Sequence, residues 1–327
     1  MDMNDLGRFA RVFDGITAWS GETPAGHVAD FLGVVSPEEF LTRDSLASLA
    51  ERPDPFRPGL PTLGGGRNCE FWFEAADWVI AAREARDQFV MATLGAFYGY
   101  QAIGSFRALT LLNPMPYRLI GVEPLAEKIA GVRRHMRLNG IDPDRQWLIQ
   151  AAVTADNEPA LFPVGAPSVA GHNCIATNSP SVREDYLRAL VAEGRAEEAL
   201  ANLLLRNTTG ITIGLGPGNR FTAEVKYVSC VTLGDVLGPF SFVDYVEADL
   251  QQSEMLAFPP FMELLRRRVR RIHISTHGAD VHHMLHGLFA ERGWEIVFSY
   301  APGSMHESPA GPFTTNDGVL TVRNPDF

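Results

Sequence analysis

Short apolar runs alternate with longer amphipathic segments over most of the chain after residue 87. The runs have the length and composition of buried strands, and the segments between them have helical spacing. The predicted strands cover residues 89–94, 118–122, 147–153, 225–230, 242–248, 272–275, 295–300 and 319–323. The predicted helices cover residues 100–111, 125–138, 253–265 and 279–291. This alternation predicts an α/β fold with a mainly parallel sheet of about seven strands and helices on both faces.

Two parts of the chain lack this alternation. Residues 1–86 are broken by many prolines and by the run Gly64-Gly-Gly66, although residues 71–86 have the composition of a helix. We interpret them as an N-terminal extension that caps a core domain at residues 87–327. Residues 163–222 combine a polar stretch, a helical segment at 182–205 and a glycine-rich loop at 210–219. They are predicted to be an insertion that forms a lid over the strand ends.

Composition and charge narrow the classes of function. Hydrophobic residues make up 46% and charged residues 20%, and no apolar run is long enough to span a bilayer. The 28 basic residues face 39 acidic ones, and this net charge of -11 disfavours binding to nucleic acid and to anionic membranes. Three widely separated cysteines suggest neither disulfides nor a cysteine zinc site. The acidic start lacks the pattern of a secretory signal, so we expect a cytoplasmic protein.

A glycine turn follows the strand predicted at residues 89–94. Gly95 and Gly99 suit a tight turn into a helix, although this spacing is more often a packing feature than a ligand site. Glu123 follows the next strand, 24 positions after Gly99, where a carboxylate can bind ribose hydroxyls or merely cap a helix. The three-glycine dinucleotide pattern is absent, which disfavours a nicotinamide dehydrogenase. S-adenosylmethionine, which has no phosphate, is the better candidate.

Polar residues follow two further strands. Asp249, Gln251, Gln252 and Glu254 come after the strand at 242–248 and are expected in the same crevice as the glycine turn, unless Ser253 and Glu254 serve only the next helix. His277 follows the strand at 272–275, where it could act as a general base or metal ligand. Other histidines, at 282 and 286, lack the glutamate of a zinc motif and are interpreted as packed or solvated.

Together these motifs resemble the FkbM family of S-adenosylmethionine-dependent methyltransferases over most of the chain. The segments that carry the resemblance are Leu94-Gly-Ala-Phe-Tyr-Gly99, Val122-Glu-Pro124, Ala151-Ala-Val153, Asp249-Leu-Gln-Gln-Ser-Glu254, Ile272-His-Ile-Ser-Thr-His-Gly278 and Asp317-Gly-Val319. The resemblance implies a Rossmann-like class I methyltransferase fold. It also implies O-methylation of a hydroxyl on a sugar or natural product.

The resemblance also assigns roles to individual positions. The implied cofactor-binding residues are Thr93, Gly95, Ala96 and Gly99 at the methionine part, Glu123 at the ribose, Ala151 and Ala152 at the adenine, and Asp249 near the sulfonium. Asp249 and His277 would be the catalytic residues, one of them as base, and the candidate ligands of a divalent metal.

Four positions depart from the pattern usual in that family. Thr93 stands where members usually have Asp or Glu, Phe97 where they usually have glycine, and Gln252-Ser253 where they usually have Gly-Ala. A hydroxyl cannot replace a carboxylate beside a cationic group, so a catalytically degenerate binding or scaffolding subunit is the alternative function. The expected partner is a small-molecule or saccharide acceptor. Its identity, the need for a metal and a homo-oligomeric state are left open by the sequence.

Overall fold

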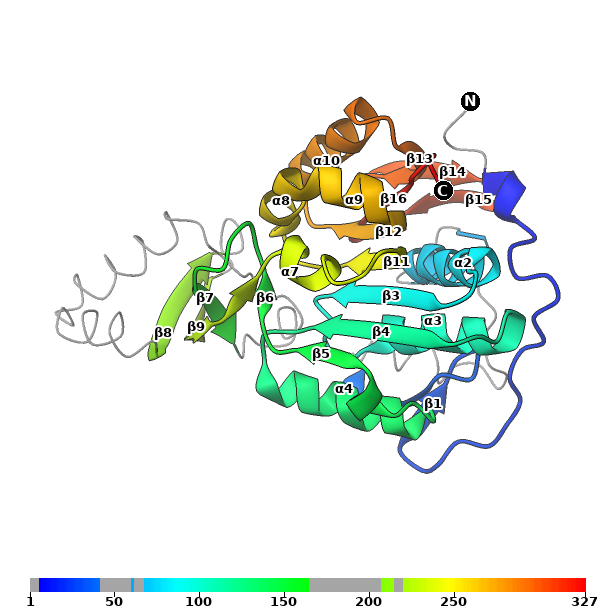
Figure 1. The fold of residues 1–327 in the computed structure, drawn as a ribbon, viewed down its shortest axis with the longest axis horizontal. Helices are drawn as coiled ribbons and strands as arrows, with labels where there is room; N and C mark the ends of the chain where they lie inside the picture. The colour runs from blue at the N-terminus through cyan, green and yellow to red at the C-terminus, as the bar shows by residue number, and fades with distance from the viewer. Residues whose placement is uncertain (1–5, 42–59, 62–67, 165–206, 215–219) are drawn as a thin grey trace, which may run out of the picture.

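A computed structural model describes residues 6–41, 60–61, 68–164, 207–214 and 220–327 (Figure 1). Its centre is a seven-stranded sheet with the order β13-β16-β12-β11-β3-β4-β5. These strands are β3 (Phe89–Leu94), β4 (Tyr117–Val122), β5 (Trp147–Ile149), β11 (Val243–Ala248), β12 (Val269–Thr276), β13 (Glu295–Tyr300) and β16 (Gly318–Arg323). All pair in parallel except β16, which runs antiparallel to both neighbours. This order, with the last strand inserted in reverse, confirms the predicted Rossmann-like class I methyltransferase fold.

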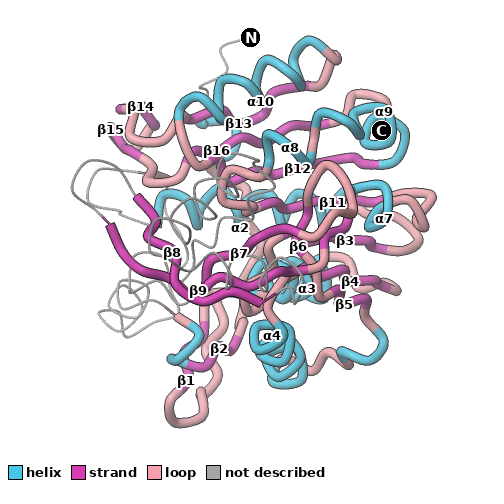
Figure 2. Tube along the Cα trace, turned by 90° about the vertical axis from the view of Figure 1, so that its left-hand side faces the viewer, coloured by secondary structure: helices cyan, strands magenta, loops and turns pink. Residues whose placement is uncertain are grey.

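Helices cover both faces of the sheet (Figures 1 and 2). One apolar core joins the sheet to α2 (Asn68–Glu84), α3 (Tyr100–Leu112) and α4 (Ala126–Leu138), and a second joins it to the later helices. The later helices are α7 (Leu233–Leu237), α8 (Glu254–Ala257), α9 (Met262–Arg268) and α10 (Ala279–Glu291). Every residue of β3 and β11 is buried, as expected for central strands covered on both faces.

Two predicted elements are interrupted in the structure. The helix expected at residues 253–265 is split into α8, a 3₁₀ turn at Pro259–Phe261 and α9, because two consecutive prolines supply no backbone N–H. The strand expected at 147–153 is likewise split. Only β5 joins the main sheet, while β6 (Ala152–Val153) pairs with β10 (Cys230–Val231) in a separate ladder.

The predicted insertion is described only in part. A three-stranded antiparallel sheet with the order β7-β9-β8 contains β7 (Ala160–Val164), β9 (Arg220–Val228) and β8 (Asn207–Gly214), and lies beyond the ends of β3 and β4 in Figure 1. The prediction of a loop from residue 210 is wrong as far as residue 214, because alternating Thr and Ile residues pair with β9. The strand expected at 225–230 therefore belongs to this region, not to the main sheet. The helix predicted at 182–205 lies outside the described residues.

The N-terminal segment packs against the helices of one face. Asp30 accepts the backbone N–H groups of Leu32 and Val34 at 2.9 Å and the Tyr100 hydroxyl at 2.7 Å, which ties a buried turn to α3. Two short strands, β1 (His27–Ala29) and β2 (Val35–Pro37), lie beside α4 (Figure 2). The helix predicted at 71–86 is confirmed as α2, while the domain boundary at residue 86 stays a prediction. Across the described part of the chain, we find no helix long and apolar enough to cross a membrane.

Candidate functional site

The glycine turn after β3 lies against the end of β11. Gly95 and Ala96 donate backbone hydrogen bonds to the Val122 carbonyl at 3.0 and 2.9 Å, and Gly95 has a φ of 80°. A Cβ atom at Gly95 would stand 2.0 Å from the carbonyl oxygen of Asp249. Only glycine satisfies both the left-handed conformation and this close approach. The turn therefore brings the ends of three neighbouring strands, β3, β4 and β11, together.

Phe97 has a left-handed backbone conformation of the kind that glycine adopts readily. Its φ is 47°, and its N–H donates to Glu123 Oε2 at 2.9 Å. The Lys128 ammonium lies 3.8 Å from the centre of the Phe97 ring and 4.0 Å from that of Tyr98. The turn therefore stays left-handed with a bulky side chain, at a strain of about 1 kcal/mol.

Glu123 is a buried carboxylate at the end of β4, with 6% exposure. Besides the bond from Phe97, its Oε1 accepts the N–H of Leu125 at 3.1 Å. Burial raises the pKa of Glu123 to about 7, although these two hydrogen bonds act in the opposite direction. Each carboxylate oxygen can accept a second bond, so the group fits a ribose diol.

The remaining predicted cofactor positions are small and buried. Ala151 and Ala152 are 2% and 3% exposed, directly after β5, and the backbone N–H of Glu123 bonds to Ile149 at the end of that strand. Ala96 and Thr93 are 0% and 2% exposed. The structure therefore brings the predicted positions to one edge of the sheet, between the ends of β5 and β11.

Asp249 and His277 meet across the ends of β11 and β12. His277 Nε2 lies 3.4 Å from Asp249 Oδ1 and 3.6 Å from Asp317 Oδ1, while its Nδ1 lies 3.4 Å from Glu254 Oε1. The side-chain amide nitrogen of Gln251 donates to Asp249 Oδ1 at 2.7 Å and lies 2.6 Å from His277 Nε2. Glu254 also accepts the N–H of Leu250 at 2.8 Å, so it holds this loop.

The charges in this cluster shift the pKa values of the two predicted catalytic residues and so distinguish their roles. Desolvation lowers the pKa of His277, but the hydrogen bond to Glu254 and the charges of Asp249, Glu254 and Asp317 outweigh it and raise the pKa to about 9. At pH 7 the ring then carries its proton and is unsuited to act as a base. Desolvation also raises the pKa of Asp249, which His277 partly offsets. Asp249, with 39% of its side chain exposed, is the better candidate base.

A metal at Asp249 and His277 finds no support in the structure. Within the described ranges, no group of three or more His, Cys, Asp or Glu residues has an arrangement that could hold a metal ion. His277 is instead engaged with carboxylates. The loop is also strained, since Gln251 and Gln252 have φ values of 53° and 80°. Like Phe97, Gln252 has a left-handed backbone conformation that glycine adopts more readily.

Sequence reasoning missed an acidic wall contributed by α2 and β11. Burial, with the carboxylates of Glu247, Glu70, Asp249 and Asp317, raises the pKa of Glu74 well above its usual value, so these groups lie within electrostatic reach of one another. The spacing of Glu70 and Glu74 would put both on one helix face. This spacing is a weak signal in the sequence, because it lies in a proline-broken segment that predicts only a cap on the core.

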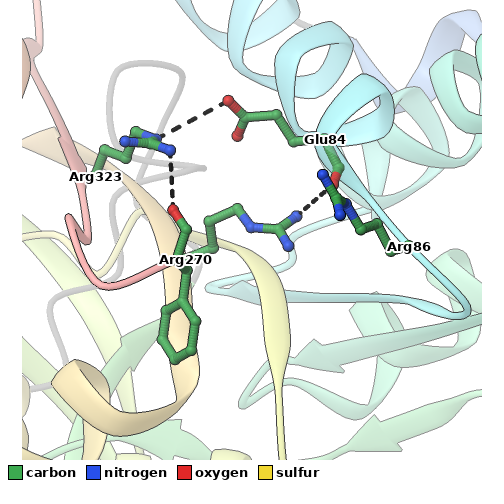
Figure 3. Close-up of a pocket in the computed structure, with 5 residues that line it drawn as sticks. Glu84, Arg86, Arg270 and Arg323 are labelled. Atoms are coloured by element: carbon green, nitrogen blue, oxygen red, sulfur yellow. Dashed lines mark hydrogen bonds and ion pairs between the residues drawn. The ribbon is translucent and has the colours of Figure 1, made fainter.

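An open groove of about 480 Å³ lies at the opposite edge of the sheet and is lined by Glu84, Arg86, Arg270, Arg323 and Phe327 (Figure 3). Arg270 donates to the Glu84 carbonyl at 2.8 Å and to Asp244 at 3.0 Å, and Arg323 donates to the Phe327 carbonyl at 2.9 Å. These arginines stabilise the ends of α2, β12 and β16. The groove is remote from the glycine turn.

No protein-family model matches the chain. A protein of Jannaschia sp. (strain CCS1), named "Putative methyltransferase", is 23% identical over 304 residues, which is 92% of this chain and 93% of that protein. The solved methyltransferase FkbM from Methylobacillus flagellatus KT matches with a TM-score of 0.38 and 10% identity, over 73% of this chain and 45% of its own. Precorrin-6y C5,15-methyltransferase from Geobacter metallireducens GS-15 matches with a TM-score of 0.41 and 8% identity, over 92% and 98%.

Proposed function

We propose that the protein is an S-adenosylmethionine-dependent methyltransferase that methylates a hydroxyl group of a sugar or natural product. The observation that carries this proposal is the convergence of the Gly95 turn, Glu123 and Asp249 at the strand ends of a class I methyltransferase fold. Similarity to the Jannaschia protein along nearly the whole of both chains supports it. Ligands of open α/β sheets bind at this edge.

The residues present fit most of the cofactor. Glu123 has free acceptor capacity for ribose hydroxyls, and Ala151 and Ala152 are small apolar residues of the kind that can pack against a flat base. Because residue 95 is a glycine, no side chain stands between the turn after β3 and the end of β11. When bound, the cofactor supplies a methyl group on a sulfonium, already activated for transfer. For the amino-acid end of the cofactor, Thr93 supplies no charge.

Asp249 is the residue we assign to the acceptor hydroxyl. It is partly exposed at the strand end, and desolvation raises its pKa toward the range in which a carboxylate is an effective base. The protonated His277 orients Asp249 from one side, and Gln251 orients it from the other. Asp249 would accept the hydroxyl proton while the loop holds the oxygen in line with the methyl group.

The alternative is a catalytically degenerate subunit that only binds or scaffolds. Thr93 and Phe97 motivate it, but the backbone at Phe97 retains the turn and its bond to Glu123. This retention favours a working cofactor site. A nicotinamide dehydrogenase stays disfavoured because the chain lacks the three-glycine pattern.

Calorimetric titration with S-adenosylhomocysteine and with NAD tests the proposal. We expect S-adenosylhomocysteine to bind and NAD to give no heat. Glu123→Gln should weaken binding about tenfold or more through loss of charged hydrogen bonds to the ribose, with a smaller loss for the 2′-deoxyribose analogue. Glu263→Gln, an exposed change on α9, is the control and should leave affinity unchanged. Absence of binding at millimolar ligand would contradict the enzyme and favour the scaffold.

A further inference from the structure

The first turns of α2 lie at the same sheet edge as the glycine turn. Glu70 accepts the backbone N–H of Asp317 at 3.0 Å, directly before β16, and β16 begins beside Thr276 at the end of β12. At the other end of the helix, Glu84 lies 3.9 Å from Arg323, where β16 ends. The helix therefore runs across the sheet with its N-terminal turns over the candidate site.

Glu247 is the strand neighbour of Thr93. The two residues pair in register between β11 and β3, and Glu247 is 2% exposed. Its Oε2 accepts hydrogen bonds from Trp78 Nε1 at 3.0 Å and from the Tyr245 hydroxyl at 2.9 Å. No described residue donates a hydrogen bond to its other oxygen, Oε1. A buried carboxylate thus stands beside the position where the family has one on β3.

Glu74 is a second carboxyl group on the face of α2 that contacts Glu247. It precedes Trp78, which donates to Glu247, by one helical turn. Burial and the neighbouring carboxylates, Glu247 first among them, raise the pKa of Glu74 well above its usual value. Since these carboxylates disfavour a further negative charge, a cation bound beside the partly buried Glu74 would stabilise its charged form.

We propose that Glu74, supported by Glu247, holds the positively charged amino group of the cofactor's methionine end, in place of the carboxylate that Thr93 lacks. The inference rests on the proposed function, because it names the residues that complete the same cofactor site. The negative group has moved from β3 to α2 and β11. The departure at Thr93 is then a relocation of charge and not a loss of cofactor binding.

Two ligands that differ in the amino-acid part test the inference. S-adenosylhomocysteine carries the ammonium group, whereas 5′-methylthioadenosine has the same nucleoside and sulfur without it. In calorimetric titrations, Glu74→Gln should lower the affinity for S-adenosylhomocysteine about tenfold or more and leave that for 5′-methylthioadenosine within about twofold. Glu84→Gln, on the same helix but about 15 Å farther along, is the matched control and should change neither affinity.

The double variant Thr93→Asp, Glu74→Gln should regain most of the lost affinity, and its circular dichroism verifies that it folds. Equal losses of affinity for both ligands in Glu74→Gln would reveal a merely structural role. No loss for either ligand would mean that another residue holds the amino group. Either result overturns the inference. Failure of the unmodified protein to bind either ligand contradicts the proposed function itself. Binding by the unmodified protein with no selective loss contradicts only the role of Glu74.

Discussion

Single backbone positions form the turns at the strand ends. Phe97 and Gln252 occupy left-handed conformations, with φ values of 47° and 80°. The sequence predicts their proximity to a cofactor but not their strain, because nothing in either side chain signals a positive φ. Gly95 is different: its role follows from the contact with Asp249, which only the folded chain creates.

Replacing Gln252 by glycine should stabilise the protein by about 0.5–1 kcal/mol, because glycine adopts a φ of 80° without strain. The side chain is exposed, so little packing is lost. Urea unfolding of the variant and the unmodified protein measures the difference. A lower unfolding free energy in Gln252→Gly would show that the side chain contributes more than its backbone strain removes.

Gly95→Ala should destabilise the protein far more than the same substitution at another glycine with a positive φ. The new Cβ would meet the Asp249 carbonyl at 2.0 Å, whereas Gly303, with a φ of 69°, has open space around it. We expect a loss above about 3 kcal/mol for Gly95→Ala and about 1 kcal/mol for Gly303→Ala. Thermal unfolding checks both. Equal losses would mean that the close approach at Gly95 is unimportant.

At the scale of elements, the sequence predicts strands and helices where apolar periodicity is strong, and fails where a local breaker or a distant partner decides. The helix expected at 279–291 is confirmed as α10, while Pro259-Pro260 divides the helix expected at 253–265. The place of α2 could not be predicted from periodicity. It depends on Asp77, which binds Arg271 and His273 on β12 and Thr321 on β16.

Asp77→Asn should destabilise the protein by about 3–5 kcal/mol, because it leaves the buried Arg271 with only the more distant carboxylate of Glu84, at 3.7 Å. The matched change Asp326→Asn removes a partly exposed pair with Arg266 and should cost less than about 1 kcal/mol. Denaturant unfolding compares the two. A small effect at Asp77 would show that α2 is held by apolar packing alone.

At the scale of the whole molecule, the acidic site makes stability depend on pH. The pKa of His277 is raised to about 9, so its stabilising contribution is present below pH 6.5 and is lost as pH rises through 9. Burial raises the pKa of Glu123 to about 7. The unfolding free energy therefore also falls as the pH rises toward 7. Desolvation lowers the pKa of His135 and His282 to about 4. These two histidines lower the unfolding free energy only as the pH falls below 6.5.

The unfolding free energy should therefore fall by at most about 3 kcal/mol between pH 7 and pH 9.5. In His277→Gln this decline should become smaller, since the proton that His277 gains on folding is removed, while Asp249 and Glu74, whose pKa values are also raised, remain. Urea titrations at several pH values measure it. A decline of equal size in the variant would assign the pH dependence to other groups.

A crystal structure of the protein with S-adenosylhomocysteine tests the central claim most directly. The account predicts the ribose at Glu123, the adenine beside Ala151 and Ala152, and the amino group at Glu74 and Glu247. Ligand density elsewhere, or an amino group turned away from both glutamates, would contradict it.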